Sequence, residues 1–329
     1  MTSPLLSVRD LKVHFDVRVG GIFAGRYRPL KAVDGVSFEL KAGETLGIVG
    51  ESGCGKSTLG RAILRLIEPT GGRAVWLGEE LSGLDAQAMR AKRQDMQIIF
   101  QDPLASLNPR MTVGEIIAEP LKTFESGIGR EAIKTRVKEM MAKVGLLPQM
   151  INRYPHEFSG GQCQRIGIAR AMVLEPKLIV CDEPVSALDV SIQAQIVNLL
   201  MRLQSEFGLS LLFISHDLSV VRHISHRIMV LYLGRVMEIA DREAIYLRAR
   251  HPYTQALISA VPIPDPDKER EKRRLVLQGE LPSPLAPPSG CVFRTRCPKA
   301  TELCAREVPV LEEDGTGDLH RVACHHWRD

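Results

Sequence analysis

Hydrophobic residues form three short continuous runs along the chain, and each run ends at polar residues. The runs cover residues 44–49 (ETLGIV), 177–181 (KLIVC) and 209–215 (LSLLFIS). Apolar runs of this length, bounded by polar or glycine-rich stretches, predict buried β-strands. Because parallel strands buried on both faces read as continuous apolar runs, we expect these three to share one sheet.

Helical spacing of apolar residues follows the first run and separates the other two. One helix is predicted from residue 57 to about 67, and another carries Ile192, Ile196, Leu199 and Leu203, with Gly208 as its C-terminal cap. Strands that alternate with helices predict a parallel α/β sheet covered on both faces. Such a sheet binds ligands beyond the carboxyl ends of its strands.

Two stretches depart from this alternation. Between about residues 101 and 157 the strand pattern disappears, and apolar positions such as Val137 and Val144 mark an amphipathic helix, which predicts a helical insertion. After about residue 260 the composition changes, because eight of the chain's 20 prolines fall in 262–298 beside a charged run at 265–274. That charged run is typical of a solvated linker.

Composition and charge narrow the class of protein. The 329 residues are 44% hydrophobic and 25% charged, with a formal net charge of +4, as in an ordinary globular protein without a dedicated nucleic-acid surface. No apolar run approaches the roughly twenty residues that a membrane span needs. Asp10 and Lys12 interrupt the N-terminal stretch before an apolar core can form, so we expect no secretory signal peptide.

A glycine-rich turn after the first predicted strand matches the phosphate-binding pattern G-x-x-x-x-G-K-[ST]. Its residues are Gly50, Glu51, Ser52, Gly53, Cys54, Gly55, Lys56, Ser57 and Thr58. Glycines let successive backbone N–H groups point inward at phosphate oxygens, and the following helix adds its positive N-terminal end. We therefore expect Lys56 to hold the β- and γ-phosphates of ATP, and the Ser57 hydroxyl to bind Mg²⁺.

Two acids end the second predicted strand. Asp182 and Glu183 follow the apolar run LIVC. A strand end places Asp182 where its carboxylate can hold the metal through water, and Glu183 where it can polarise the attacking water. Two acids after a strand are common in surface turns, so this interpretation depends on the phosphate-binding loop.

The run Phe158-Ser159-Gly160-Gly161-Gln162 predicts a second anion-binding turn, opening a helix that starts near Cys163. One phosphate-binding loop cannot use two such turns on the same phosphate chain, so we expect Ser159 and Gly161 to reach the γ-phosphate held by a second chain. With the neighbouring QRIGIARA (164–171), this run resembles the signature of the ABC ATPases over about residues 5–260. The resemblance implies a P-loop NTPase (RecA-like) nucleotide-binding domain at 1–260, with a helical subdomain at about 102–165.

The same resemblance implies roles for further residues. Gln101 resembles the glutamine that senses Mg²⁺ and the attacking water, so the implied magnesium set is Ser57, Gln101 and Asp182. Residues 186–189 (SALD), ending in Asp189, resemble the loop that crosses the dimer. His216 resembles the switch histidine at the γ-phosphate. A histidine after a strand is often only a hydrogen-bonded polar residue without a catalytic role. The position of His216 after the other motifs, in the order that the family has them, argues for the catalytic role.

The aromatic residue that stacks on adenine is less well defined. ABC ATPases usually supply it upstream of the phosphate-binding loop, and Phe15 lies where the resemblance expects it. Residues 17–29 are an insertion relative to the shortest family members, so Tyr27 competes for the role. Both aromatics could also be ordinary core or surface residues.

The C-terminal stretch narrows the resemblance to bacterial oligopeptide and dipeptide importers. Residues 251–257 (HPYTQAL), 261–267 (VPIPDPD) and 279–298 (GELPSPLAPPSGCVFRTRCP) resemble the extension of peptide-importer ATPases, closest to their F-type subunits. We therefore expect a proline- and cysteine-rich extension at 261–329. The function implied is an ATPase (ATP and water to ADP and phosphate) that energises peptide import at the cytoplasmic face of the bacterial inner membrane.

Four cysteines in this extension are candidate metal ligands: Cys291, Cys297, Cys304 and Cys324. Their gaps of five, six and nineteen residues lack the short pairs that are usual in zinc sites, and matching extensions in the family can bind a [4Fe–4S] cluster. We therefore expect such a cluster, with a structural role. Zinc, with His320, His325 or His326 as a substitute ligand, and free thiols are the alternatives.

The partners follow from the resemblance: two membrane permease subunits, a paralogous ATPase subunit or a second copy of this chain, and indirectly an extracytoplasmic peptide-binding protein. We expect no nucleic acid, because residues 59–177 hold no sustained heptad repeat of the kind that chromosome-structure ATPases need. FSGGQ argues against a simple P-loop kinase, and Glu183 and His216 argue against a binding module without catalysis. The cargo rests on the resemblance alone, since related machines carry nickel, glutathione or cell-wall peptides.

Overall fold

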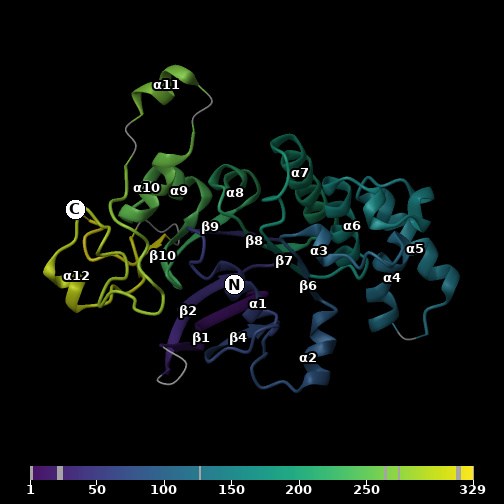
Figure 1. Ribbon diagram of the computed structural model, residues 1–329, viewed down its shortest axis with the longest axis horizontal. Coiled ribbons are helices and arrows are strands. Elements are labelled where there is room, and N and C mark those ends of the chain that lie inside the picture. Colours follow the sequence, from purple (N-terminus) through teal and green to yellow (C-terminus); the bar gives the residue numbers. More distant parts are fainter. Residues whose placement is uncertain are drawn as a thin grey trace. The chain divides into compact units, whose positions relative to one another are not determined.

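A computed structural model describes residues 3–20, 25–125, 127–262, 265–272, 275–315 and 320–328. The chain divides into two compact units (Figure 1). The first comprises residues 1–39, 46–82 and 216–329, and the second comprises residues 40–45 and 83–215. The predicted boundary near residue 260 stays a prediction.

The first unit carries two sheets and six helices in its described part. Its elements are β1 (Leu6–Val19), β2 (Arg26–Leu40), β3 (Thr45–Val49), α1 (Lys56–Ile63), β4 (Gly71–Trp76), β5 (Glu79–Glu80), α8 (Leu218–Ile224), β9 (Arg227–Tyr232), β10 (Arg235–Asp241), α9 (Arg242–Arg248), α10 (Pro252–Ala260), α11 (Pro266–Glu271), α12 (Glu302–Arg306), β11 (Glu312–Glu313) and β12 (Arg321–Val322). One sheet has the order β2-β1-β4-β5, and the other includes β11-β12-β10-β9-β3. Figure 1 shows α9 and α10 beside β9 and β10.

The second unit consists of three parallel strands and a group of helices. Its remaining elements are α2 (Ala86–Arg93), β6 (Met96–Ile99), α3 (Pro103–Ser106), α4 (Val113–Phe124), α5 (Arg130–Lys143), the 3-10 turns η1 (Pro148–Asn152) and η2 (Pro155–Glu157), α6 (Gly160–Met172), β7 (Leu178–Asp182), α7 (Val190–Phe207) and β8 (Ser210–Ile214). β7 pairs in parallel with both β6 and β8. The helices α3, α4 and α5 lie around α6 (Figure 1).

The expected strands and helices are present with small differences in their ends. All five residues of β3, β7 and β8 are buried, as expected for strands covered on both faces. Gly208 ends α7 in the left-handed conformation, with φ of 62°. The first helix is shorter than expected, because α1 ends at Ile63 and Arg65 turns the chain with φ of 49°.

The predicted parallel sheet also contains antiparallel strands. β3 and β9 pair in parallel, but β10 pairs antiparallel with both β9 and β12. The turn at Leu233 and Gly234 explains this, because both residues have positive φ and a two-residue connection can join only antiparallel neighbours. The sheet built on β1 and β4 is also antiparallel at that pair. The fold is therefore α/β with mixed sheets.

Within the first unit, a buried group of polar side chains attaches the C-terminal region to β10. His320 donates from Nε2 to Glu238 at 2.7 Å, and its Nδ1 lies 3.1 Å from Asp314. All three side chains are at most 2% exposed. Glu238 also accepts the backbone N–H groups of Arg250 and His251. Since a buried charge needs such partners, this group fixes β12 against β10.

The sequence HPYTQAL forms the start of α10. His251 is buried, and its Nδ1 accepts the N–H of Tyr253 at 3.0 Å, which caps the helix, while Pro252 occupies the first turn. Burial lowers the pKa of His251 to about 4, against 6.5 for a free histidine. The neutral ring is therefore the form that the folded chain holds.

This cap predicts a pH-dependent stability. Between pH 6.5 and 4 the unfolded chain binds a proton at residue 251 that the folded chain excludes, so His251 lowers the free energy of unfolding as the pH falls through that window. Between pH 7 and 5 we expect a loss of about 2 kcal/mol from this residue. Urea unfolding at both pH values should show a smaller loss for His251→Asn, which can cap but does not titrate. Equal losses in the two chains would contradict the assignment.

Candidate active site

The glycine-rich turn joins the end of β3 to the start of α1 and packs tightly against neighbouring backbone. Gly50 has φ of 153°, and a Cβ there would lie 2.1 Å from the carbonyl oxygen of Leu231. Gly55 has φ of 101°, and a Cβ there would lie 2.0 Å from the carbonyl oxygen of Ala32. Only glycine fits these two positions, so the loop keeps the shape that turns backbone N–H groups toward an anion.

The Lys56 side chain is bound to the backbone of the phosphate-binding loop itself. Its side chain is buried, and Nζ donates to the carbonyl oxygens of Gly50 at 2.8 Å and Glu51 at 3.0 Å. Its Nζ also lies 3.8 Å from the sulfur of Cys54. Burial raises the pKa of the Cys54 thiol, although Lys56 opposes this, so the thiol adds no negative charge at neutral pH. The turn thus holds a cation that can meet phosphate oxygens.

The two acids at the end of β7 differ in their surroundings. Asp182 is the last residue of the strand and is 1% exposed. Glu183 is half-buried and has φ of 47°, a conformation that costs energy in a residue other than glycine. Its Oε2 accepts a hydrogen bond of 3.2 Å from the Nε2 of Gln101. The structure therefore brings two of the predicted catalytic side chains into contact.

The signature residues form the exposed start of α6. The helix begins at Gly160, and so the expected start near Cys163 is wrong by one turn. Ser159 is the cap, because its hydroxyl accepts the N–H of Gln162 and the Gln162 side chain accepts the N–H of Ser159. A Cβ at Gly161 would lie 2.6 Å from Ile192. This helix start is available to an anion from outside the chain.

The remaining predicted residues occupy loop or surface positions. Asp189 precedes α7 as its cap residue without a side-chain cap bond, and the loop before it is held by Gln193, whose amide donates to the Val185 and Leu188 carbonyls. His216 is exposed and follows β8. Phe15 is 39% exposed on β1 and Tyr27 is 70% exposed on β2, so the choice between them stays a prediction.

The predicted [4Fe–4S] cluster is wrong. Within the described ranges, no group of three or more His, Cys, Asp or Glu side chains is placed to hold a metal ion, and all four C-terminal cysteines are free. Burial raises the pKa of Cys291 to about 11. The substitute histidines have other partners: Glu238 for His320, Glu307 for His325 and Thr301 for His326.

The physical reason is that this region packs on β9 and α10. Phe293 is fully buried, with its ring 5.3 Å from those of Tyr232 and Tyr253 and 5.5 Å from that of His251. Burial of one aromatic side chain contributes roughly 2–3 kcal/mol, and the ionic group at His320 adds a second attachment. The proline-rich composition suggested a segment that needs metal in order to fold, whereas this segment is attached through its aromatic packing.

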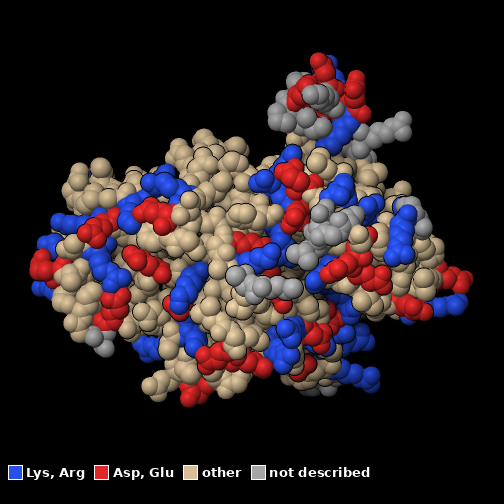
Figure 2. Space-filling view, turned by 180° about the vertical axis from the view of Figure 1, so that it is seen from behind, with Lys and Arg blue, Asp and Glu red and all other residues tan. Residues whose placement is uncertain are grey.

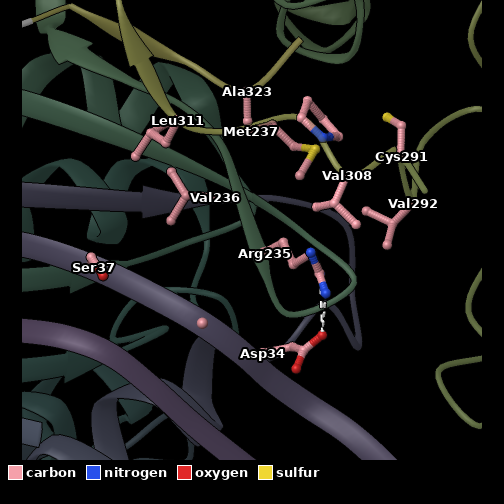
Figure 3. A pocket seen from close by; sticks show the side chains of 12 residues that line it. Asp34, Ser37, Arg235, Val236, Met237, Cys291, Val292, Val308, Leu311 and Ala323 are labelled. Atoms are coloured by element: carbon pink, nitrogen blue, oxygen red, sulfur yellow. Dashed lines mark hydrogen bonds and ion pairs between the residues drawn. The ribbon is translucent and has the colours of Figure 1, made fainter. Parts of the chain in front are cut away.

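A pocket of about 140 Å³ lies between β10 and the C-terminal region (Figure 3). Figure 3 shows the Asp34–Arg235 ion pair at one end, with an oxygen–nitrogen distance of 2.6 Å, and Val236, Val292 and Val308 among the apolar lining. Burial alone would raise the pKa of Asp34, but Arg235, Lys31 and His14 together lower it below its ordinary value. None of the predicted ATP-binding residues lines this pocket.

One contact of the phosphate-binding loop could not be foreseen from the sequence. Arg296, in the C-terminal region, binds the Glu51 carboxylate at 2.7 Å, across 245 residues of chain. No local pattern signals a pair so far apart. The cap formed by His251 was also missed, although it is local and the His-Pro dipeptide before an apolar helix could have indicated it.

Comparison with known proteins is consistent with this arrangement. The sequence model of the ABC transporter family matches residues 33–186, and that of the oligopeptide/dipeptide transporter C-terminal region matches residues 237–304. The chain is 63% identical to the oligopeptide transport ATP-binding protein OppF of Salmonella typhimurium over 97% of this chain and 95% of that protein. It is 60% identical to OppF of Haemophilus influenzae over 97% of this chain and 96% of that protein.

Solved structures show the same fold. A dimeric ATP-binding cassette in a post-hydrolysis state, bound to ADP and phosphate, is 29% identical, with a TM-score of 0.64 over 72% of this chain and 98% of that chain. The cassette cbiO1 of Clostridium perfringens is 25% identical, with a TM-score of 0.64 over 75% of this chain and 92% of that chain. The chain therefore belongs to the ABC transporter family, as an ATPase of the oligopeptide transport ATP-binding group.

Proposed function

We propose that this chain hydrolyses ATP to energise the import of oligopeptides or dipeptides across the bacterial cytoplasmic membrane. The observation that carries the proposal is the hydrogen bond between Gln101 and Glu183 at the end of β7, in a chain that also holds an intact phosphate-binding loop. A glutamate held by a glutamine amide at the end of a buried strand is suited to polarise water. Every motif position of an active ATPase carries a chemically competent residue.

ATP and Mg²⁺ would be held by separate groups of residues. The loop amides of residues 50–58 and the Lys56 ammonium would bind the phosphates. Ser57, Gln101 and Asp182 offer a hydroxyl, an amide and a carboxylate oxygen, the hard donors that Mg²⁺ prefers, so the set fits this ion. When bound, Mg²⁺ supplies charge neutralisation at the β- and γ-phosphates. Phe15, with Tyr27 as the alternative, would stack on the adenine.

Hydrolysis would then follow from the chemistry of four side chains. Glu183 accepts a hydrogen bond from water and so increases its nucleophilicity, while Gln101 holds the Glu183 carboxylate in place. Lys56 neutralises charge on the phosphate oxygens, and His216 would contact the γ-phosphate. Because these groups position and polarise rather than form covalent bonds, the reaction is a direct displacement by water.

The active site would be shared between two chains. Ser159, Gly160 and Gly161 form an exposed helix start, and Asp189 precedes the next helix along the chain. An exposed, anion-binding helix start in a chain that already has a phosphate-binding loop fits the γ-phosphate of a partner's ATP. The resemblance to peptide importers favours a paralogous ATPase subunit as that partner, with a second copy of this chain as the alternative.

The membrane partners would be two permease subunits, with a peptide-binding protein acting outside the membrane. No helix in the described ranges is long and apolar enough to cross a bilayer. Leu104 on α3 is 57% exposed and lies three residues after Gln101, so an apolar contact there would connect a permease loop to the glutamine that holds Glu183. In this proposal the chain acts at the cytoplasmic face of the inner membrane.

An ATPase acting on nucleic acid is the main alternative, and the charge distribution disfavours it. Lys and Arg number 43 and Asp and Glu number 39. Figure 2 shows both kinds interspersed over the face that it draws, without a continuous basic stripe. Sequence-independent binding of nucleic acid depends on such a stripe.

Replacement of Glu183 tests the proposed function. Glu183→Gln should keep ATP binding, because the amide is isosteric, but should reduce hydrolysis at least ~100-fold, because the amide is a poor base. Uptake of a labelled oligopeptide by vesicles carrying the whole transporter should fall to the same extent. Uptake at the wild-type rate would refute the proposal that this chain powers import.

The shared site makes a separate prediction. A Lys56→Ala chain and a Ser159→Arg chain should each be inactive alone, since every composite site then lacks one essential group. Mixing the two in a homodimer should restore one intact site, and hydrolysis should return to about a quarter to a half of the wild-type rate. For a heterodimer, the Ser159→Arg change belongs in the paralogue. Wild-type hydrolysis that stays linear in protein concentration in a strictly monomeric preparation would rule out a shared site.

A further inference from the structure

The phosphate-binding loop contains an acid. Glu51 directly follows Gly50, and its carboxylate is part of a loop that, under the proposed function, receives the anionic phosphates of ATP. An unpaired carboxylate in such a loop repels phosphate, and the repulsion is strong where protein excludes water. The Lys56 ammonium does not pair with this carboxylate, because it donates to the backbone oxygens of Gly50 and Glu51.

The carboxylate is neutralised from the C-terminal region. The Nη1 of Arg296 lies 2.7 Å from the Oε2 of Glu51. The side chain of Arg296 is 10% exposed and that of Glu51 is 27% exposed, so water screens the pair only in part. Burial by itself lowers the pKa of Arg296, but the hydrogen bond to Glu51 is the main opposing effect, and the net shift is upward. Arg296 therefore stays charged across the physiological range.

The arginine is held in place by the aromatic cluster. Phe293, three residues earlier, is fully buried against Tyr232 and Tyr253. The Arg296 guanidinium lies over the Tyr232 ring, 6.0 Å from its centroid. The hydroxyl of Tyr253 accepts the backbone N–H of Glu51 at 3.0 Å. The same cluster thus fixes both the backbone and the side chain of Glu51.

We propose that Arg296 is a positioning residue for ATP binding: it holds the Glu51 carboxylate and cancels its charge, so that the phosphate-binding loop accepts a nucleoside triphosphate. This inference rests on the proposed ATPase function and adds the C-terminal region to its nucleotide site. If Arg296 served only to attach the C-terminal region, its partner would not need to be an acid within the phosphate-binding loop.

A double-mutant cycle in the assembled transporter separates the two roles. Four chains are compared: wild type, Arg296→Ala, Glu51→Gln and the double variant. In the wild-type background, Arg296→Ala should raise the KM for ATP by about tenfold with kcat changed less than about twofold. In the Glu51→Gln background, the same change should alter KM less than about twofold, because the charge that required Arg296 is gone.

A neighbouring arginine provides the matched control. Arg294 lies in the same segment and donates to the Ser289 carbonyl at 2.9 Å, within the C-terminal region itself. Arg294→Ala should leave the KM for ATP unchanged. Arg296→Lys should give an intermediate KM, since lysine keeps the charge but loses the planar group over Tyr232.

Equal increases in KM from Arg296→Ala in both Glu51 backgrounds would overturn the proposal, because a structural tether predicts that result. An unchanged KM in the Arg296→Ala single variant would overturn it as well. Binding of a fluorescent ATP analogue to all four chains gives an independent reading, in which the same pattern is expected. If the wild-type complex binds the analogue but does not hydrolyse ATP, the proposed function fails, while the binding cycle still decides the role of Arg296.

Discussion

The close approach of the phosphate-binding loop to the backbone around it is the constraint on which the rest of the first unit depends. Gly50 meets the carbonyl of Leu231 and Gly55 meets that of Ala32, at distances that exclude any side chain. The loop can take this shape only while β9 and β2 keep their places. The elements that hold β9, including β10 and the aromatic cluster on Tyr232, therefore serve the loop as well.

The phosphate-binding loop also needs its own negative charge to be neutralised, and the C-terminal region supplies the neutralising residue. The loop offers backbone N–H groups and Lys56 to an anion, but it also carries the Glu51 carboxylate. Arg296 forms an ion pair with that carboxylate. The region that supplies this arginine is attached by Phe293 and by the buried His320 group rather than by a metal. One of its two attachments and its contact with the loop come from one short segment, because Phe293 and Arg296 are three residues apart.

Local patterns allowed much of the fold and of the site to be predicted. β3, β7 and β8 could be found because strands buried on both faces are continuously apolar, and the glycine and acid motifs follow them directly in sequence. The antiparallel partners were missed because β10 includes Glu238, whose burial depends on His320, 82 residues later. The metal prediction was wrong for a related reason: cysteine spacing is visible in a sequence, whereas the packing of Phe293 on Tyr232 and Tyr253 is not.

Under the proposed function, ATP hydrolysis by this chain is coupled to peptide import. The decisive measurement is the rate of ATP hydrolysis of the complex isolated from membranes through this chain, with and without an oligopeptide and its binding protein. We expect permease subunits in the complex and a hydrolysis rate that rises several-fold with peptide, since cargo binding would favour closure of the two ATPase chains. A rate that ignores peptide and rises instead with DNA or RNA would contradict it.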